Sequence, residues 1–381
     1  MSRLKKSKGS KSRKTRVPLR ANRSRPARDR GWTKRFRESA ADGVEDADPV
    51  ARESVVAKGE HSRMRTVVEP AQGQPAGNLL LGRVVALSGP VAEVDDGTRL
   101  WPCSVRRLLR TRRIEERHPL AVGDYVRFSV FQQEGRERSA VIEQVLPRRS
   151  SLMRTYDERV QTIAANVDQA VIVASLEEPP PKPHLIDRYI VSAHAGQMTP
   201  VVCLNKCDLV PAIPGQDPVR QLRELYEPLG YPCVVCSATA AHGLDQLRKV
   251  LTGKTSVFVG QSGVGKSSLL NALQPDLSLP TGEVSTRTFK GRHVTTTTRL
   301  LKLSFGGWVV DTPGVRSFAL ARVPREELEK HFVEIAPLVA ECKFPDCAHV
   351  HEGGCAVRAA AESGRIHPSR YDSYVRLFCE E

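Results

Sequence analysis

Long apolar runs are missing from this sequence, and no hydrophobic stretch approaches the roughly 18 uncharged residues that a membrane-spanning helix needs. We therefore exclude a membrane protein. The N-terminus also lacks the apolar core of a secretory signal. Hydrophobic residues still form 40% of the 381 residues, an ordinary share for a globular protein, and the chain is long enough for two or three domains.

Acidic residues are almost missing from residues 1–37, where 16 Lys and Arg residues accompany a single acidic residue, Asp29. The rest of the chain has 42 basic and 42 acidic residues, so the whole net charge of +15 lies in this tail. Few apolar residues are available there to offset the entropy of ordering, and we expect the tail to be disordered. It suits contact with a phosphate backbone, although a solubility tail or an organellar targeting peptide has a similar composition.

The nine cysteines do not suggest a disulfide framework, because they are spread along the chain apart from three near its end. This distribution favours a reducing, cytoplasmic compartment and one metal site. Cys342, Cys347, His349 and Cys355 place three thiols and one imidazole within 14 residues, the ligand set of a closed zinc site. His351 is a competing ligand, and buried free cysteines are the alternative. The other cysteines that we expect to be buried and free are Cys103, Cys203, Cys233, Cys236 and Cys379.

The segment before the first regular pattern, residues 38–78, is acidic and rich in Ala, Gly and Pro, which indicates a linker. Five short alternating runs follow and predict strands at 82–87, 91–94, 100–105, 125–131 and 140–145. Such a series with tight turns predicts a small β-barrel of the OB-fold type, whose face often binds oligonucleotides. A purely structural barrel is the alternative. The arginines that favour RNA contact are Arg106, Arg107, Arg110, Arg112 and Arg113.

The pattern changes after Val160 to apolar runs that are separated by amphipathic stretches. Runs rich in β-branched residues predict strands at 170–174, 200–204, 234–236, 256–259 and 308–310, and helices are expected at 185–195 and 218–229. Unalternating apolar strands are typical of a parallel sheet that is covered on both faces. We therefore predict a doubly wound α/β domain.

The sharpest motif is a G-x-x-x-x-G-K-S phosphate loop between an expected strand and an expected helix at 267–273. Its glycines let backbone N–H groups surround phosphates, Lys266 neutralises β- and γ-phosphate oxygens, and the Ser267 hydroxyl binds magnesium. The predicted loop and the residue after it are Gly260, Gln261, Ser262, Gly263, Val264, Gly265, Lys266, Ser267 and Ser268.

Two further segments fit the switches of a nucleotide hydrolase. Asp311-Thr312-Pro313-Gly314 follows a strand, so that Asp311 could hold magnesium through water and the Gly314 amide could sense the γ-phosphate. Between this motif and the phosphate loop lies the polar stretch 291–298, in which Thr296, or else Thr295, could complete the magnesium shell. A β-prone threonine run without this role is the alternative.

Guanine recognition is predicted at Asn205-Lys206-Cys207-Asp208. Asp208 could accept hydrogen bonds from N1–H and the 2-amino group of guanine, a pair that adenine lacks, so an ATPase is disfavoured. The Lys206 stem could lie along the base and Asn205 could brace the loops. Ser237-Ala238, one strand later, could offer a backbone N–H to guanine O6.

The order of these motifs is unusual, because the base-reading segments precede the phosphate loop. A circularly permuted chain can build the same site, since permutation only joins the old termini and opens a loop elsewhere. It also places whatever follows Gly314 where nucleotide state could move it. A helix is expected next, at 324–340, before the cysteine cluster.

Together, the barrel, the permuted motifs and the Cys3His cluster closely resemble the ribosome small-subunit-dependent GTPase A family, called RsgA or YjeQ, over residues 79–381. The resemblance implies a cytoplasmic, monomeric GTPase that binds the 30S subunit late in its assembly, hydrolyses GTP to GDP there and leaves. It further implies that the barrel and the zinc module contact 16S rRNA, with one zinc ion per chain and magnesium with GTP. We accordingly expect a basic tail and linker at 1–78, an OB-fold at 79–148, a permuted GTPase domain at 149–318 and a zinc-binding helical domain at 319–381.

Two positions depart from familiar patterns. Val294 replaces the first of three threonines that usually follow the family's histidine, His293. Val315 stands where Ras-like enzymes carry the glutamine that orients water, so we expect slow intrinsic turnover and suggest His293 as the catalytic group. The rival functions are an RNA-binding protein with structural GTP and a permuted GTPase that serves the large subunit or a tRNA.

Overall fold

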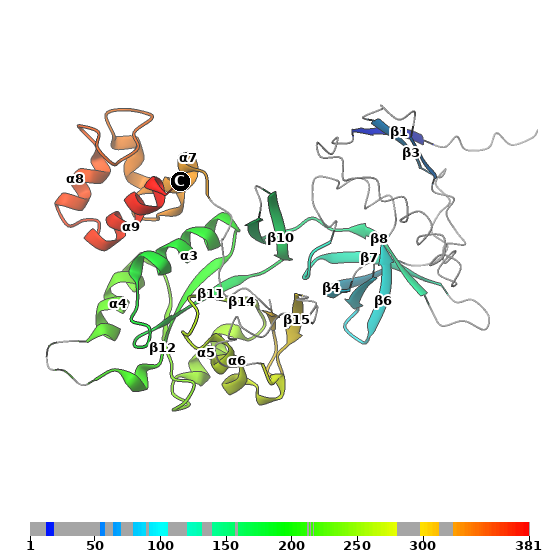
Figure 1. Cartoon of the computed structure of the whole chain (residues 1–381), viewed down its shortest axis with the longest axis horizontal. Helices are drawn as coiled ribbons and strands as arrows, with labels where there is room; N and C mark the ends of the chain where they lie inside the picture. Colours follow the sequence, from blue (N-terminus) through cyan, green and yellow to red (C-terminus); the bar gives the residue numbers. More distant parts are fainter. Residues whose placement is uncertain are drawn as a thin grey trace, which may run out of the picture. The chain divides into compact units, whose positions relative to one another are not determined.

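The structure is a computed structural model of the whole chain (Figure 1). It describes the backbone of residues 13–18, 54–57 and 64–69 and then residues 79–88, 91–105, 120–131, 139–156, 159–211, 213, 215, 217–279, 298–311 and 323–380. His293, Thr295, Thr296 and Gly314 lie outside the described residues, as does the arginine-rich stretch 106–113.

The first 78 residues, which we expected to lack regular structure, contain three short strands within the described part. They form an antiparallel sheet in the order β1-β3-β2, with β1 at Arg13–Pro18, β2 at Ser54–Ala57 and β3 at Met64–Glu69.

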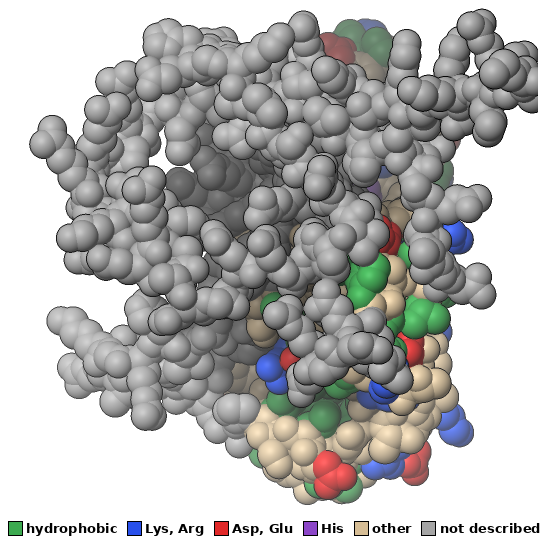
Figure 2. Space-filling model, turned by 90° about the vertical axis from the view of Figure 1, so that its right-hand side faces the viewer, with side chains coloured by type: hydrophobic (Ala, Val, Ile, Leu, Met, Phe, Trp, Pro, Cys, Tyr) green, Lys and Arg blue, Asp and Glu red, His purple; other side chains and the backbone are tan. Residues whose placement is uncertain are grey.

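The chain divides into two compact units, of which the first includes residues 89–120 and 125–146, and the second includes residues 83–88, 121–124 and 147–381. On the face shown in Figure 2, basic, acidic and hydrophobic side chains of the described part are interspersed, without a patch of one charge sign. No helix within the described residues is long and apolar enough to cross a bilayer.

The predicted five-stranded barrel is confirmed. Its strands are β4 (Leu80–Ser88), β5 (Val91–Asp95), β6 (Leu100–Val105), β7 (Tyr125–Phe131) and β8 (Ser139–Val145). They follow the order β4-β5-β6-β8-β7, and a further pairing of β4 with β7 closes the barrel. Val94, Trp101 and Phe128 are buried inside it, with the two ring centroids 5.9 Å apart. A Cβ on Gly82 would lie 2.4 Å from Val94, so only glycine allows this close packing.

The predicted parallel sheet is also confirmed, in the order β13-β12-β11-β14-β16, with β15 added antiparallel to β16. The strands are β11 (Gln169–Ser175), β12 (Thr199–Asn205), β13 (Cys233–Val235), β14 (Thr255–Val259), β15 (Arg299–Lys302) and β16 (Trp308–Asp311). The hairpin of β9 (Ser151–Tyr156) and β10 (Arg159–Ala165), which precedes the sheet, was not anticipated.

Helices cover both faces of the sheet. They are α3 (Pro183–Ala195), α4 (Pro218–Tyr226), α5 (Leu244–Leu251) and α6 (Lys266–Leu273). Neighbouring residues of β11 belong to different cores: Ile172 packs with Ile190 of α3, whereas Val171 packs with Leu247 of α5 and Leu269 of α6. This alternation explains why the strand is apolar along its whole length.

The C-terminal part is helical but more broken than predicted. The expected continuous helix at 324–340 is wrong, because the structure has α7 (Arg325–Leu328), then 3-10 turns at Glu329–His331 and Ala336–Glu341. Pro337 has no N–H for an α-helical bond, and Phe332 adopts an extended conformation with φ −103°. Two helices that were not anticipated follow, α8 (Ala356–Glu362) and α9 (Pro368–Cys379).

Four of the cysteines predicted to be buried and free are buried, namely Cys103, Cys203, Cys233 and Cys236. Cys379 is exposed, so the prediction for that residue is wrong. It is the last residue of α9, where the helix end leaves the C-terminal core.

A buried ionic cluster joins α9 to α3. The Arg370 Nη1 atom lies 2.5 Å from the Asp187 Oδ1 atom, and its Nε donates to Glu334 Oε1 at 2.6 Å. The Tyr226 hydroxyl also donates to Asp187, at 3.0 Å. Arg370 and Asp187 are both 0% exposed, so neither charge has water to replace a lost partner.

We predict that Arg370→Ala lowers the free energy of unfolding by about 3–5 kcal/mol, because it leaves the Asp187 charge buried without its partner. Arg376→Ala, at an exposed position of the same helix, is the matched control and should change stability by less than about 0.5 kcal/mol. Urea denaturation measures both. Equal stability of the two variants would contradict this account of the cluster.

Candidate nucleotide site and metal centre

The nucleotide motifs meet at one edge of the parallel sheet. Asn205 ends β12, Ser237 follows β13, Gly260 follows β14 directly, and Asp311 ends β16. Parallel strands present their carboxyl ends at the same edge, which is where ligands bind in open α/β sheets. The permuted order of the chain therefore still brings the segments predicted to read the base and to bind phosphate to one side.

Asn205 connects these two segments. Its Nδ2 atom donates to the carbonyl of Val264 in the phosphate loop at 2.8 Å, and the side chain is buried with its residue only 1% exposed. Gly265 has φ +90°, and a Cβ there would lie 2.4 Å from the Asn205 Nδ2 atom. The glycine of the motif is thus needed both for its backbone conformation and for the approach of Asn205.

The phosphate loop runs from β14 into the first turn of α6. Gly260 passes so close to β11 that a Cβ would lie 2.2 Å from the Val173 carbonyl oxygen. The Lys266 ammonium donates to the carbonyls of Gly260 and Gln261, both at 2.8 Å. Ser267 and Ser268 follow on the first turn of α6 and are half-buried. The loop is therefore curled around its lysine at a helix N-terminus, where anions are favoured.

Asp208 is held by two hydroxyl groups. A hydrogen bond from Ser237 has the largest effect and lowers the pKa of the Asp208 carboxyl. Burial opposes it, and a weaker contribution from Thr239 helps to keep this pKa below its usual range. Thr239 Oγ1 donates to Asp208 Oδ2 at 3.0 Å, and it lies 3.0 Å from the Ser237 hydroxyl. Ser237 is fully buried and accepts from the Ala240 N–H at 2.9 Å. One oxygen of an exposed carboxylate is thereby anchored to a rigid turn.

Thr239 is not among the residues predicted from the sequence. The available signal was its place directly after Ser237-Ala238, where a side chain from the same turn can reach the N-K-x-D loop. Among the described residues, no group accepts a hydrogen bond from the Ala238 N–H, which is the atom expected to meet guanine O6. Lys206 adopts a left-handed conformation with φ +61°, and its ammonium donates to the Glu178 carbonyl in the loop after β11.

Asp311 ends β16 opposite Arg299 of β15. Burial raises the pKa of the Asp311 carboxyl, and the nearby Arg299 only partly opposes this effect. A divalent cation next to it would favour the ionised form. Of the residues predicted to hold magnesium, the structure describes Asp311 and Ser267, whereas Thr296 and its alternative Thr295 lie in the segment that the structure does not describe.

The structure brings Cys342, Cys347, His349 and Cys355 together, with one ligand atom of each within 4.8 Å of all the others. His349 Nδ1 lies 3.5 Å from the Cys342 sulfur and 3.4 Å from the Cys355 sulfur, and the two sulfurs are 3.9 Å apart. Zinc–sulfur bonds of about 2.3 Å imply tetrahedral edges of roughly 3.8 Å, so this donor set fits a zinc ion. His351, the competing ligand, is exposed and is not part of the cluster.

Local geometry shapes this metal centre. His349 is fully buried and has φ +61°, a conformation that directs its ring towards the thiols. Burial raises the pKa of the Cys347 thiol to about 12, so the thiolate becomes the stable form only beside a cation. Although burial opposes it, the N–H groups of Ala348, Val350 and His351 hold the pKa of Glu352 at about 2 and pin the turn that carries His349.

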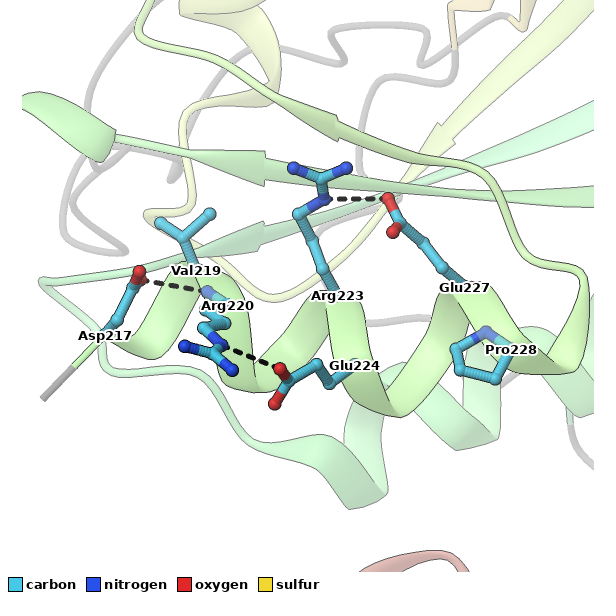
Figure 3. Close-up of a pocket in the computed structure, with 7 residues that line it drawn as sticks. All are labelled: Asp217, Val219, Arg220, Arg223, Glu224, Glu227 and Pro228. Carbon is cyan, nitrogen blue, oxygen red and sulfur yellow. Dashed lines mark hydrogen bonds and ion pairs between the residues drawn. The ribbon is translucent and has the colours of Figure 1, made fainter.

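A separate surface pocket of about 480 Å³ lies along α4 (Figure 3). Its arginines are already paired: Arg220 with Glu224 and Arg223 with Glu227, each at 2.7 Å and one helical turn apart. None of the nucleotide or metal residues lines it. It therefore contributes nothing to the site described above.

Comparison with known proteins decides the family. A family model described as RsgA GTPase matches residues 145–321. Relatives named "Small ribosomal subunit biogenesis GTPase RsgA" include one from Alkaliphilus metalliredigens, 38% identical over 75% of this chain and 92% of the relative. Another, from Pseudomonas aeruginosa, is 42% identical in an alignment that covers 82% of this chain and 88% of the relative. The chain belongs to the RsgA GTPase family.

Solved structures agree with this assignment. YjeQ from Thermotoga maritima is 36% identical and superposes with a TM-score of 0.65. The superposition covers 79% of this chain and 98% of the YjeQ chain. YloQ, described as a circularly permuted GTPase, is 30% identical and superposes with a TM-score of 0.62. The superposition covers 81% of this chain and 96% of the YloQ chain. This RsgA-family protein is therefore a circularly permuted GTPase, a hydrolase acting on GTP, which excludes a protein that binds GTP only for structure.

We predict that Thr239→Val weakens GDP binding about tenfold, because a hydrogen bond to a charged acceptor contributes roughly 1.5 kcal/mol. Binding of inosine diphosphate, which lacks the 2-amino group, should weaken less, since fewer bonds then depend on the carboxylate's orientation. Displacement of a fluorescent GDP analogue measures both affinities.

The control for this variant is Thr252→Val, which removes a hydroxyl bonded to the Arg248 carbonyl at 2.8 Å at the end of α5. It should leave both affinities unchanged. Unaltered GDP binding by the Thr239 variant would show that Asp208 needs no such anchor.

Proposed function

We propose that this GTPase binds the small ribosomal subunit late in its assembly, in the cytoplasm, and hydrolyses GTP to GDP and phosphate while bound there. The observation that carries the proposal is the joined nucleotide site, in which Asn205 of the base-reading loop bonds Val264 of the phosphate loop. The names of the relatives from Alkaliphilus and Pseudomonas refer to small-subunit biogenesis, and they support the small ribosomal subunit as the partner of this protein.

The chain's own residues suggest how GTP would be held. Asp208, with one oxygen anchored by Thr239, would accept hydrogen bonds from N1–H and the 2-amino group of guanine. The Ala238 N–H would donate to O6, and the Lys206 stem would lie along the base. Lys266 would leave the carbonyls of Gly260 and Gln261 for the β- and γ-phosphates, which attract its charge more strongly.

Magnesium would supply charge neutralisation at the β- and γ-phosphates. Ser267 would bind it directly, Asp311 through water, and Thr296 is our choice for the first switch. The Gly314 amide would sense the γ-phosphate, so the segment after it would respond to nucleotide state.

We propose that the Cys342, Cys347, His349 and Cys355 cluster holds one zinc ion per chain, which ties together the turns of the C-terminal module. This module, at residues 319–381, has 8 Lys and Arg against 11 Asp and Glu. The electrostatic part of binding to 16S rRNA is therefore assigned chiefly to the basic tail, with the barrel as a second contact. A monomer suffices for this arrangement.

We predict that GTP turnover by the purified protein is slow and rises at least tenfold with isolated 30S subunits. The reason is that Val315 leaves no water-orienting glutamine after the second switch, so the ribosome must complete the site. Phosphate release is measured at fixed moderate salt, because a tail with 16 basic residues makes binding salt-sensitive.

Isolated 50S subunits and tRNA are the controls for this assay. Stimulation by either of them instead of 30S would assign this GTPase to a different partner. No stimulation by any of the three would remove the ribosomal part of the proposal and leave the GTPase assignment intact.

We further predict that His293→Ala lowers 30S-stimulated turnover by about 10²–10⁴-fold, the range for loss of a general base or water-positioning group, and leaves GDP affinity unchanged. His351→Ala, an exposed histidine outside the metal cluster, is the control. Single-turnover hydrolysis with saturating 30S separates the chemical step from binding. Full stimulated activity in the His293 variant would reject its catalytic role.

A further inference from the structure

The two nitrogens of the His349 ring face different groups. Nδ1 points into the metal cluster, 3.5 Å from the Cys342 sulfur and 3.4 Å from the Cys355 sulfur. Nε2 lies on the other side, 3.0 Å from the Oε2 atom of Glu329. Within the described residues, the Glu329 carboxylate is the one side-chain partner recorded for Nε2, and no cysteine competes for it.

This division determines which nitrogen can bind a metal ion. A neutral imidazole carries its proton on one nitrogen and a lone pair on the other, and only the lone pair can bind a metal. A carboxylate is an acceptor, so it favours the tautomer with hydrogen on Nε2. Nδ1 is then left as the ligand.

We propose that Glu329 is the positioning residue of the metal centre, holding His349 in the tautomer and orientation in which Nδ1 binds the ion. The inference rests on the zinc site of the proposed function, because it assumes that the cluster holds a metal. It adds a fifth residue, from a different segment of the chain, to the four ligands.

The surroundings of Glu329 make it suited to this task. It opens the turn Glu329–His331 between Leu328 and Phe332, which are 3% and 0% exposed in the C-terminal core. Its own side chain is only 25% exposed, so its hydrogen bond is partly shielded from water. The backbone of His349 is fixed separately, since its carbonyl accepts from the Tyr371 hydroxyl at 2.8 Å. Loss of Glu329 would thus release the ring without releasing the main chain.

Glu329, which contacts His349, comes from a part of the chain that precedes the cluster. It directly follows α7, the first helix that the structure describes after β16, whereas the four ligands all come later in the chain. The cluster is therefore contacted by a turn that lies between β16 and the four ligands in the sequence.

The test is zinc affinity, measured on the full-length protein by competition with a chromophoric chelator. Glu329→Ala should weaken zinc binding about 10- to 100-fold, the usual effect of removing such a partner. Glu329→Gln should fall between this variant and the natural protein, because its amide oxygen still accepts from Nε2–H. Glu326→Ala, an exposed glutamate of α7, is the control and should bind zinc normally.

A second readout separates positioning from general loss of structure. In the cobalt-loaded protein, Glu329→Ala should shift the visible ligand-field bands, since the imidazole donor is altered, while Glu326→Ala should not. Unchanged zinc affinity and unchanged bands in both Glu329 variants would overturn the inference. Failure of the natural protein to bind zinc would instead overturn the zinc assignment itself.

Discussion

The hydrogen bond from the Asn205 amide to the Val264 carbonyl is the contact on which the nucleotide site depends. It joins the last residue of β12 to the loop that follows β14, and β11 lies between these two strands in the sheet. The bond is buried, so an unpaired Val264 carbonyl would incur a desolvation cost of roughly 1–3 kcal/mol. The predicted base-recognition loop and the predicted phosphate loop are thereby held in a fixed relation to each other.

This bond connects the ends of two strands that the sheet holds in place. The order in which these strands occur along the chain therefore matters little for the site. The sheet places the ends of β12, β14 and β16 at one edge whichever is made first. What permutation does change is the path of the chain afterwards. In this protein the chain after β16 continues into α7 and Glu329 and then into the helical part that carries the Cys3His cluster.

Much of this architecture could be predicted from sequence, because its signals are local. The strand at 169–175 is apolar throughout, and the phosphate loop has glycines that its own backbone conformation requires. The residues that sequence analysis missed act across space: Thr239 on Asp208, Glu329 on His349, and Arg370 on Asp187 from 183 positions away. No periodicity or spacing records the pairs of Glu329 and Arg370, whereas Thr239 directly follows Ser237-Ala238 in the sequence. The broken helix after residue 324 was missed for a related reason, since Phe332 is extended to fill the C-terminal core.

The pairing of Asp187 with Arg370 bears on how the protein is made. During translation, α3 leaves the ribosome long before α9 has been synthesised. Asp187 therefore cannot pair with Arg370 until 183 further residues have been added to the chain. The parallel sheet can form in the nascent chain, but the contacts between α3 and α9 cannot form until α9 emerges. We therefore expect a chain arrested before α9 to be more open to proteases and chaperones than the finished one.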